Sequence, residues 1–166
     1  MRLLIAYGSK RGGTAGLAEM IGREFSEAGF ATTVEPAGKV RSLDGYDAVV
    51  IAGALYAFRW HRDARRFARR HARALRARPV WLVSSGPLDE SATTGDIPPV
   101  KQVESVMSAL GARGHMTFGG RLEANAKGFP ASAMAKTKAG DWRDPAHVHR
   151  WVLSIAEELV RLDKAA

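Results

Sequence analysis

The sequence predicts an α/β protein in which helices cover both faces of a parallel sheet. Along the chain, short apolar runs alternate with segments of helical period, which is typical of strands joined by crossover helices. One run, Ala48-Val49-Val50-Ile51-Ala52, has no polar alternation and therefore suits a strand that is buried on both faces. With 166 residues, 46% of them hydrophobic, we expect a single domain over residues 1–166.

The N-terminal part predicts a strand, a helix and a second strand. The apolar run Leu3-Leu4-Ile5 is the first strand, and it leads into a loop rich in glycine. Apolar residues then recur at helical spacing over residues 15–28, and Gly29 suits the C-terminal cap of that helix. Residues 31–35 predict the next strand.

The central part predicts two further helices and a strand. Residues 61–75 form an amphipathic helix with apolar residues on one side and arginines on the other. Residues 79–84 form a strand that begins at Pro79, and the polar residues 88–97 form an exposed loop. A helix then runs from Pro98 to the cap at Gly111.

The C-terminal part is less uniform. Residues 115–118 predict the last strand, and Asp144-Pro145 begins a final helix with a regular apolar face. Between them, residues 121–140 are rich in Ala and Lys and predict no element. The predicted loops after the first, third and fourth strands cover residues 8–14, 53–60 and 84–88, and the carboxyl ends of parallel strands place such loops at one site.

The loop of residues 8–14 suits a phosphate group. It joins a strand to the N-terminus of a helix, so several backbone N–H groups point at one place. Two better-known phosphate loops are excluded. The loop that binds nucleoside triphosphates has a lysine between its last glycine and the following Ser or Thr, but here Thr14 directly follows Gly13. The dinucleotide-binding fingerprint has a glycine at the position that Lys10 occupies. A monophosphate cradle that uses the hydroxyls of Ser9 and Thr14 remains; a tight turn that binds nothing is the alternative.

The positive charge lies in one segment. Between Arg59 and Arg78 there are nine arginines and one acid, Asp63, whereas the rest of the chain has 16 basic and 16 acidic residues. The segment suits a solvated helix face or reversible contact with an anionic membrane. Nucleic-acid binding would depend on charge alone, since no RNA-binding motif accompanies it.

Other chemistry is excluded or weakly indicated. The absence of cysteine excludes disulfides and thiolate sites, and the five histidines are too scattered to predict a metal site. His71 suits a packed structural role, and His61 suits a helix start more than contact with a substrate. No apolar run has the length of a signal peptide or a membrane span, so we expect a cytoplasmic protein, with peripheral contact at the inner membrane face as an extension.

The segment Ser9-Lys10-Arg11-Gly12-Gly13-Thr14 resembles the phosphate loop of the flavodoxin family, [ST]-x-[ST]-G-x-T. It matches at Ser9, Gly12 and Thr14, and Arg11 replaces a hydroxyl residue. The resemblance implies a flavodoxin-like three-layer sandwich: a five-stranded parallel sheet of order 2-1-3-4-5, with helices on both faces. It also implies FMN as a noncovalently bound cofactor.

A narrower similarity is to the menaquinone-dependent protoporphyrinogen oxidases and related flavodoxin-domain proteins. Besides the phosphate loop it includes residues 53–61, their continuation to His71, and Gly140-Asp141-Trp142. This similarity implies an FMN-binding oxidoreductase that passes electrons from a planar substrate, such as protoporphyrinogen IX, to a quinone. The alternative is a flavodoxin-type electron carrier between redox partner proteins.

The resemblance also implies the site residues, none of them with an assigned catalytic role. Those that hold the flavin phosphate are Ser9, Lys10, Arg11, Gly12, Gly13 and Thr14. Those that flank the isoalloxazine ring are Ala54, Leu55, Tyr56, Ala57, Phe58, Ser85, Gly86, Pro87 and Leu88. Tyr56 and Phe58 are the aromatics placed to stack on the ring. The loop after the fourth strand has no aromatic, so one flavin face is open, or Trp60, Trp142 or a partner covers it.

Overall fold

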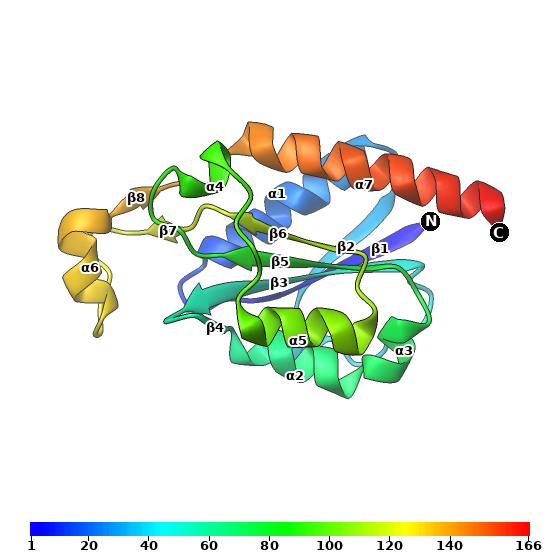
Figure 1. Cartoon of the computed structure of the whole chain (residues 1–166), viewed down its shortest axis with the longest axis horizontal. Helices are drawn as coiled ribbons and strands as arrows, with labels where there is room; N and C mark the ends of the chain where they lie inside the picture. The colour runs from blue at the N-terminus through cyan, green and yellow to red at the C-terminus, as the bar shows by residue number, and fades with distance from the viewer.

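A computed structural model describes all residues, 1–166, and shows three layers with one sheet in the middle (Figure 1). The five parallel strands lie in the order β2, β1, β3, β5, β6, which confirms the predicted order 2-1-3-4-5. Their bounds are Ala31–Pro36, Arg2–Gly8, Ala48–Tyr56, Val80–Ser85 and Gly114–Phe118. The flavodoxin-like α/β fold class is therefore confirmed.

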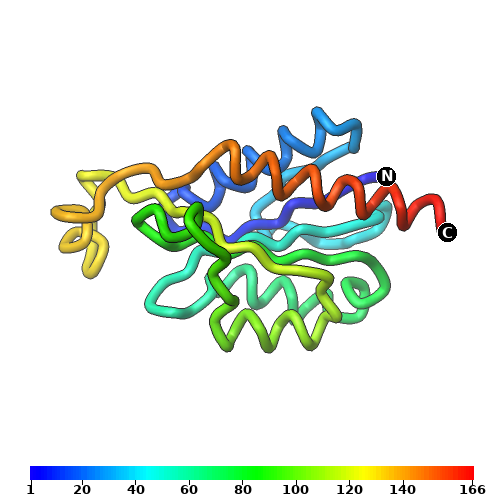
Figure 2. Tube along the Cα trace, turned by 45° about the horizontal axis from the view of Figure 1, so that its top comes forward, coloured from blue at the N-terminus to red at the C-terminus, as the bar shows by residue number.

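The strand register places three carboxyl ends side by side. At the end of β1, Gly8 pairs with Gly53 of β3, and Ala54 pairs with Ser85 of β5. Because the strands are parallel, the loops that leave β1, β3 and β5 all begin at this edge. The two chain termini lie at the opposite end of the sheet (Figure 2).

Helices cover the two faces of the sheet. One face is covered by α1 (Gly13–Glu27) and α7 (Pro145–Ala165), which pack against each other. The other face is covered by the 3₁₀ turn η1 and by three helices, α2, α3 and α5. Their bounds are Ala37–Lys39, Arg62–Arg70, Ala72–Arg76 and Lys101–Leu110. No helix combines the length and the apolar character that crossing a bilayer requires.

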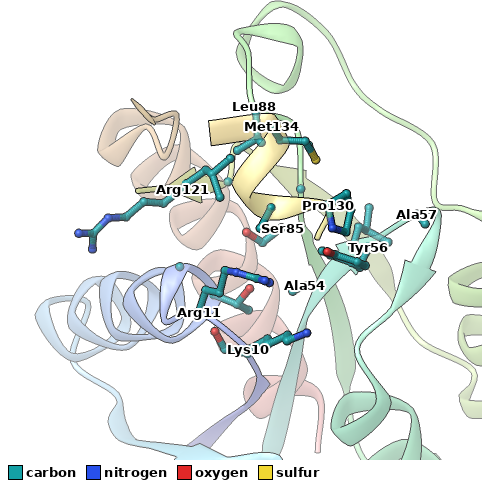
Figure 3. A pocket seen from close by; sticks show the side chains of 18 residues that line it. Lys10, Arg11, Ala54, Tyr56, Ala57, Ser85, Leu88, Arg121, Pro130 and Met134 are labelled. Carbon is teal, nitrogen blue, oxygen red and sulfur yellow. The ribbon is translucent and has the colours of Figure 1, made fainter. Parts of the chain in front are cut away.

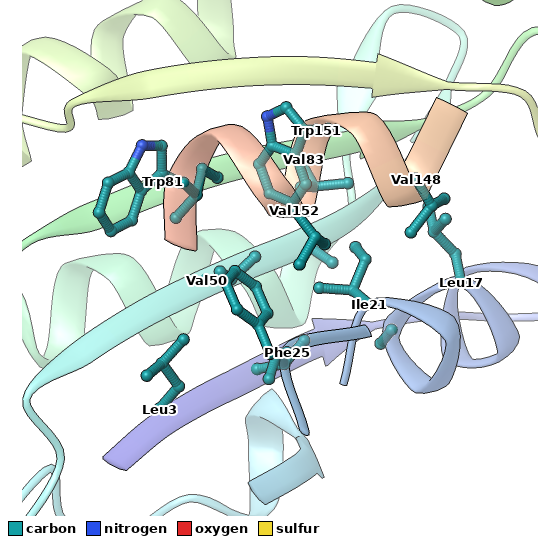
Figure 4. Close-up of a cluster of buried hydrophobic side chains, with 14 of the residues drawn as sticks. Leu3, Leu17, Ile21, Phe25, Val50, Trp81, Val83, Val148, Trp151 and Val152 are labelled. Carbon is teal, nitrogen blue, oxygen red and sulfur yellow. The ribbon is translucent and has the colours of Figure 1, made fainter. Parts of the chain in front are cut away.

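Each face of the sheet has its own apolar core, because alternate side chains of a strand point to opposite sides. In β1, Leu3 and Ile5 pack under α1 and α7, whereas Leu4 and Ala6 face α2. Figure 4 shows the first cluster, in which Phe25 and Trp151 lie over the central strands. The unbroken apolar strands predicted from sequence are therefore covered on both faces.

Three central predictions need correction. The helix predicted over residues 61–75 is divided into α2 and α3 at His71, which has φ −102° and ψ 16°. The imidazole of His71 packs on Phe67, with ring centroids 4.9 Å apart, so its predicted structural role is confirmed. The polar loop predicted over residues 88–97 contains a short helix, α4 (Ser91–Thr94), and the helix predicted from Pro98 begins at Lys101.

The segment without a predicted element, residues 121–140, has structure of its own. It contains β7 (Arg121–Leu122) and α6 (Ala131–Lys138), and it leads into β8 (Gly140–Asp141). β7 and β8 pair antiparallel, and Leu122 packs on Ala131 and Ala135 of α6. In Figure 1 this unit extends beyond the carboxyl edge of the sheet.

Candidate functional site

A cavity of about 340 Å³ opens at the carboxyl edge of the sheet, within the size range of small-molecule sites (Figure 3). The loops after β1, β3 and β5 supply most of its wall, as the parallel topology predicts. The unit of β7 and α6 supplies the rest. The lining residues are Ser9, Lys10, Arg11, Gly13, Thr14, Ala54, Leu55, Tyr56, Ala57, Ser85, Gly86, Leu88, Gly120, Arg121, Leu122, Pro130, Ala131 and Met134.

The loop after β1 is shaped by Gly12, which precedes the first residue of α1. Gly12 has φ 80°, a left-handed conformation that glycine adopts without a steric cost, and its N–H donates to Ser9 Oγ at 3.1 Å. The N–H groups of Lys10, Arg11, Gly13 and Thr14 donate no hydrogen bond within the chain. Free donors at a helix N-terminus are the arrangement that binds anionic groups in proteins.

The loop after β3 is a tight hairpin. β3 continues into β4 (Arg59–Trp60) through Ala57 and Phe58, and Tyr56 pairs with Arg59. Ala57 and Phe58 have φ 47° and 61°, which matches a two-residue turn with left-handed conformations but no glycine. Such conformations are strained for residues with a Cβ and are often found at functional sites. The turn holds the Tyr56 ring at the cavity.

The tryptophan of this hairpin has a structural role. Trp60 is 1% exposed, and its Nε1–H donates to the Val83 carbonyl at 3.2 Å. A Cβ on Gly53 would overlap the indole, so glycine at this strand end leaves the space that Trp60 fills. Trp60 therefore packs beneath the hairpin and does not line the cavity.

The charges around the cavity are positive. Lys10 Nζ and Arg11 Cζ each lie 5.9 Å from the centroid of the Tyr56 ring, within the range of cation–π contact. Arg121 extends away from the cavity, and its guanidinium pairs with Glu123 at 2.8 Å (Figure 3). No carboxylate is among the lining residues.

The β7–α6 wall was not predicted from the sequence. It contributes Gly120, Arg121, Leu122, Pro130, Ala131 and Met134. Arg11 fastens this unit to the loop after β1, because its guanidinium donates to the Lys127 carbonyl at 3.1 Å. The one signal in the sequence was Gly119-Gly120: a Cβ on Gly120 would come within 3.2 Å of the Gly86 carbonyl oxygen.

Arg143 supports the loop from behind. Its guanidinium donates to the Gly13 carbonyl at 3.3 Å and pairs with Asp141 at 2.6 Å. The hydrogen bonds and charge of Arg143 lower the pKa of the Asp141 carboxyl, so the pair stays charged. Gly16 leaves room for the guanidinium, since a Cβ there would overlap it. The segment Gly140-Asp141-Trp142 thus helps to position the loop and does not line the cavity.

Twelve of the fifteen predicted site residues line the cavity, and Gly12, Phe58 and Pro87 do not. The side chain of Phe58 is 84% exposed and lies outside the cavity, so only Tyr56 of the two predicted aromatics lines the cavity. Neither Trp60 nor Trp142 covers the other side, which is formed by the β7–α6 wall.

The histidines lie outside the cavity. His61 Nδ1 accepts from the Asp63 N–H at 3.1 Å and caps α2, which confirms its predicted place at a helix start. His115 Nε2 lies 2.8 Å from the Ser84 hydroxyl, and burial lowers the pKa of His115 to about 4. The lining residues therefore offer donors, cations and apolar surface, and no acid–base pair.

Comparisons with known proteins agree with this fold. A family model described as the flavodoxin domain matches residues 4–135. No protein of curated function matches the sequence.

Solved structures with the same fold include two flavodoxins and a flavo di-iron protein. Oxidised flavodoxin 2 from Bacillus cereus has a TM-score of 0.64 at 15% identity, with 95% of this chain and 99% of that chain covered. A mutant flavodoxin from Pseudomonas aeruginosa has a TM-score of 0.60 at 15% identity, covering 95% and 97%. A flavo di-iron protein from Thermotoga maritima has a TM-score of 0.63 at 12% identity, but only 35% of that chain is covered.

Proposed function

This chain belongs to the flavodoxin domain family, and we propose that it binds FMN in the cavity at the carboxyl edge and transfers electrons between redox partners. FMN is the cofactor of flavodoxins, and when bound it accepts and returns electrons. The narrower relation to protoporphyrinogen oxidases has no support from the comparisons. The observation that carries the proposal is the set of free N–H groups in the loop after β1.

The residues present fit the cofactor. The N–H groups of Lys10, Arg11, Gly13 and Thr14 have no acceptor within the chain and would hold the phosphate. Gly12 keeps the loop in a conformation that a Cβ would strain. The Tyr56 ring and the apolar side chains of Leu88 and Met134 would flank the ring system.

The exposure of the cavity favours electron transfer. Tyr56, at the mouth, is 41% exposed, so a ring beside it would lie close to the protein surface. Electron transfer between proteins needs such an accessible cofactor and no acid–base pair, and the lining residues contain none.

A second candidate is an oxidoreductase that acts on a planar substrate or a quinone. The observation in its favour is the β7–α6 wall, which adds the apolar surfaces of Leu122, Pro130 and Met134 beside the site. Steady-state turnover with protoporphyrinogen and a menaquinone analogue separates the two functions. Sustained turnover favours the oxidoreductase, and electron transfer to redox proteins without such turnover favours the carrier.

The cofactor assignment is tested by comparing FMN with riboflavin, which lacks the phosphate. We expect FMN to bind more tightly than riboflavin. We expect Thr14→Ala to lower the affinity for FMN by about tenfold to a hundredfold, because a hydrogen bond to a charged group contributes about 1.5–3 kcal/mol. Thr137→Ala, an exposed threonine on α6, is the control. Equal affinity of the wild type for FMN and riboflavin would contradict the assignment.

Valine substitutions at two glycines separate the effect of backbone strain from the effect of position beside the cavity. Gly12 and Gly111 have φ 80° and 62°, and a Cβ on either meets no atom within 4 Å. Valine at each position therefore has a similar backbone cost, but only Gly12 adjoins the cavity loop. We expect Gly12→Val to lower FMN affinity and Gly111→Val to leave it unchanged, as measured by flavin fluorescence titration.

A further inference from the structure

The mouth of the cavity continues into a basic surface. The hairpin that carries Tyr56 also carries Phe58, which is 84% exposed, and Arg59, which is exposed as well. β4 ends at Trp60 and α2 begins at Arg62, so the base of the hairpin leads directly into the first turn of α2. A Cβ on Gly8, at the end of β1, would overlap His61 Nδ1, which places the start of α2 at the same edge as the cavity.

Most arginine side chains between Arg59 and Arg78 make no contact that stabilises the fold. Arg65, Arg76 and Arg78 donate hydrogen bonds to backbone carbonyls. The other six are exposed, and their guanidinium groups make no hydrogen bond or ion pair within the chain. We call these six the arginine face: Arg59, Arg62, Arg66, Arg69, Arg70 and Arg73.

Part of the arginine face lies on one side of α2, and no acidic side chain neutralises its charge. At 100° per residue, Arg62, Arg66 and Arg69 lie within about 60° of one another around α2. Asp63 is the single acid in the segment, and it pairs with none of the arginines. On the opposite layer, α7 carries acids beside its arginines and has no such excess. The net charge of +8 therefore acts mainly at α2 and α3.

We propose that an acidic redox protein docks on the hairpin tip and the arginine face, with Phe58 in contact beside the cavity mouth and the arginines extending from it along α2 and α3 (Figure 1). This inference rests on the proposed electron transfer. The charge is complementary to an acidic partner, and the apolar tip lies at the cavity mouth, where a partner must approach a bound flavin. Electrostatic attraction raises the rate of encounter between partners and makes that rate sensitive to salt.

The composition of the surface favours this occupant. Among the exposed large hydrophobic residues, none lies on α2 or α3, and outside the cavity Phe58 of the hairpin is the one beside the arginine face. Stacking on successive bases uses a series of aromatic side chains, and an interfacial helix anchors in a bilayer through an apolar face of its own. One apolar residue beside many charges suits a transient protein contact. The anionic membrane predicted from the sequence is the competing occupant.

The test is stopped-flow electron transfer between the FMN-loaded protein and two probes at several salt concentrations. With an acidic plant-type [2Fe–2S] ferredoxin, the reduced cluster loses one electron and the flavin gains it. With basic cytochrome c, the reduced flavin loses one electron and the ferric haem gains it. For the wild type we expect the ferredoxin rate to fall and the cytochrome c rate to rise as salt increases.

Two charge-matched variants locate the effect. Arg62→Glu with Arg66→Glu should slow the ferredoxin reaction at low salt by about tenfold or more. Arg150→Glu with Arg161→Glu makes the same change in net charge on exposed residues of α7 and should change the rate by less than about threefold. Phe58→Ser should slow the reaction at every salt concentration, because its contact does not depend on charge.

The outcomes keep the inference separate from the proposed function. A wild type that neither binds FMN nor accepts electrons from dithionite refutes the proposed function. A protein that binds FMN and is reduced by dithionite, but whose ferredoxin rate responds equally to the two charge variants, refutes the docking surface alone. Arginine-dependent sedimentation with phosphatidylserine vesicles, together with an unchanged ferredoxin rate, would assign the face to a membrane and overturn the proposal.

Discussion

His115 makes the stability of the fold depend on pH. Its imidazole lies on β6 and its Nε2 is 2.8 Å from the hydroxyl of Ser84, which is 0% exposed. Burial lowers the pKa of His115 from 6.5 to about 4. Because the unfolded chain then binds this proton more readily than the folded chain does, stability is present above pH 6.5 and is lost as pH falls toward 4.

The size of the effect follows from the shift. A pKa lowered from 6.5 to about 4 corresponds to about 3 kcal/mol, and partial exposure of the ring reduces this to about 2 kcal/mol. His115→Gln keeps a hydrogen-bonding group beside Ser84 and cannot titrate. We expect the wild type to lose about 2 kcal/mol more free energy of unfolding than the variant between about pH 7 and about pH 4.5.

Urea unfolding at the two pH values measures this difference. His71 and His147 also have pKa values lowered by burial, so both proteins lose stability on acidification. Subtracting the loss of His115→Gln from that of the wild type isolates His115. Equal losses in the two proteins would refute the argument that burial keeps this imidazole neutral.

Two further predictions concern the cavity. With FMN bound, Lys10→Glu should lower the potential for full flavin reduction by on the order of 50 mV. The reason is that an anion in place of a cation destabilises the negative charge of the reduced flavin by about 1–2 kcal/mol after screening. Spectroelectrochemical titration measures this, and an unchanged or higher potential contradicts it. Arg11→Ser removes the 3.1 Å hydrogen bond to the Lys127 carbonyl, so amide hydrogen exchange over residues 121–138 should accelerate by about fivefold while α1 stays unchanged. Equal exchange in that segment would show that Arg11 does not hold the wall.

The phosphate loop was predictable because its geometry is local. Gly12 and Gly13 lie between an apolar strand and a helix of regular period, and that order alone turns the N–H groups toward one place. The β7–α6 wall was not predictable. A strand of two residues such as β7 has too few positions to show alternation, and it exists only through its pairing with β8, in which Arg121 faces Asp141 and Leu122 faces Gly140.

The sequence also did not predict which of the two aromatic residues after β3 faces the cavity. Sequence places Tyr56 and Phe58 two positions apart after β3, which suggests equal access to a bound ring. The turn at Ala57 and Phe58 adopts left-handed conformations without glycine, which turn propensity does not predict. Tyr56 therefore faces the cavity, and Phe58 lies outside it.

The sequence by itself determined the fold class, because runs of apolar residues and segments of helical period encode local structure. Family resemblance supplied the strand order and twelve of the cavity residues. Only the tertiary structure decided which segment forms the remaining wall of the cavity and which arginine side chains are left free at the surface. The β7–α6 wall reaches the loop after β1 through contacts such as Arg11 with Lys127, 116 positions apart. The guanidinium groups of six arginines stay free, whereas packing directs three others to backbone carbonyls. Contacts between distant positions depend on how the layers pack, and the spacing of residues along the chain does not encode that packing.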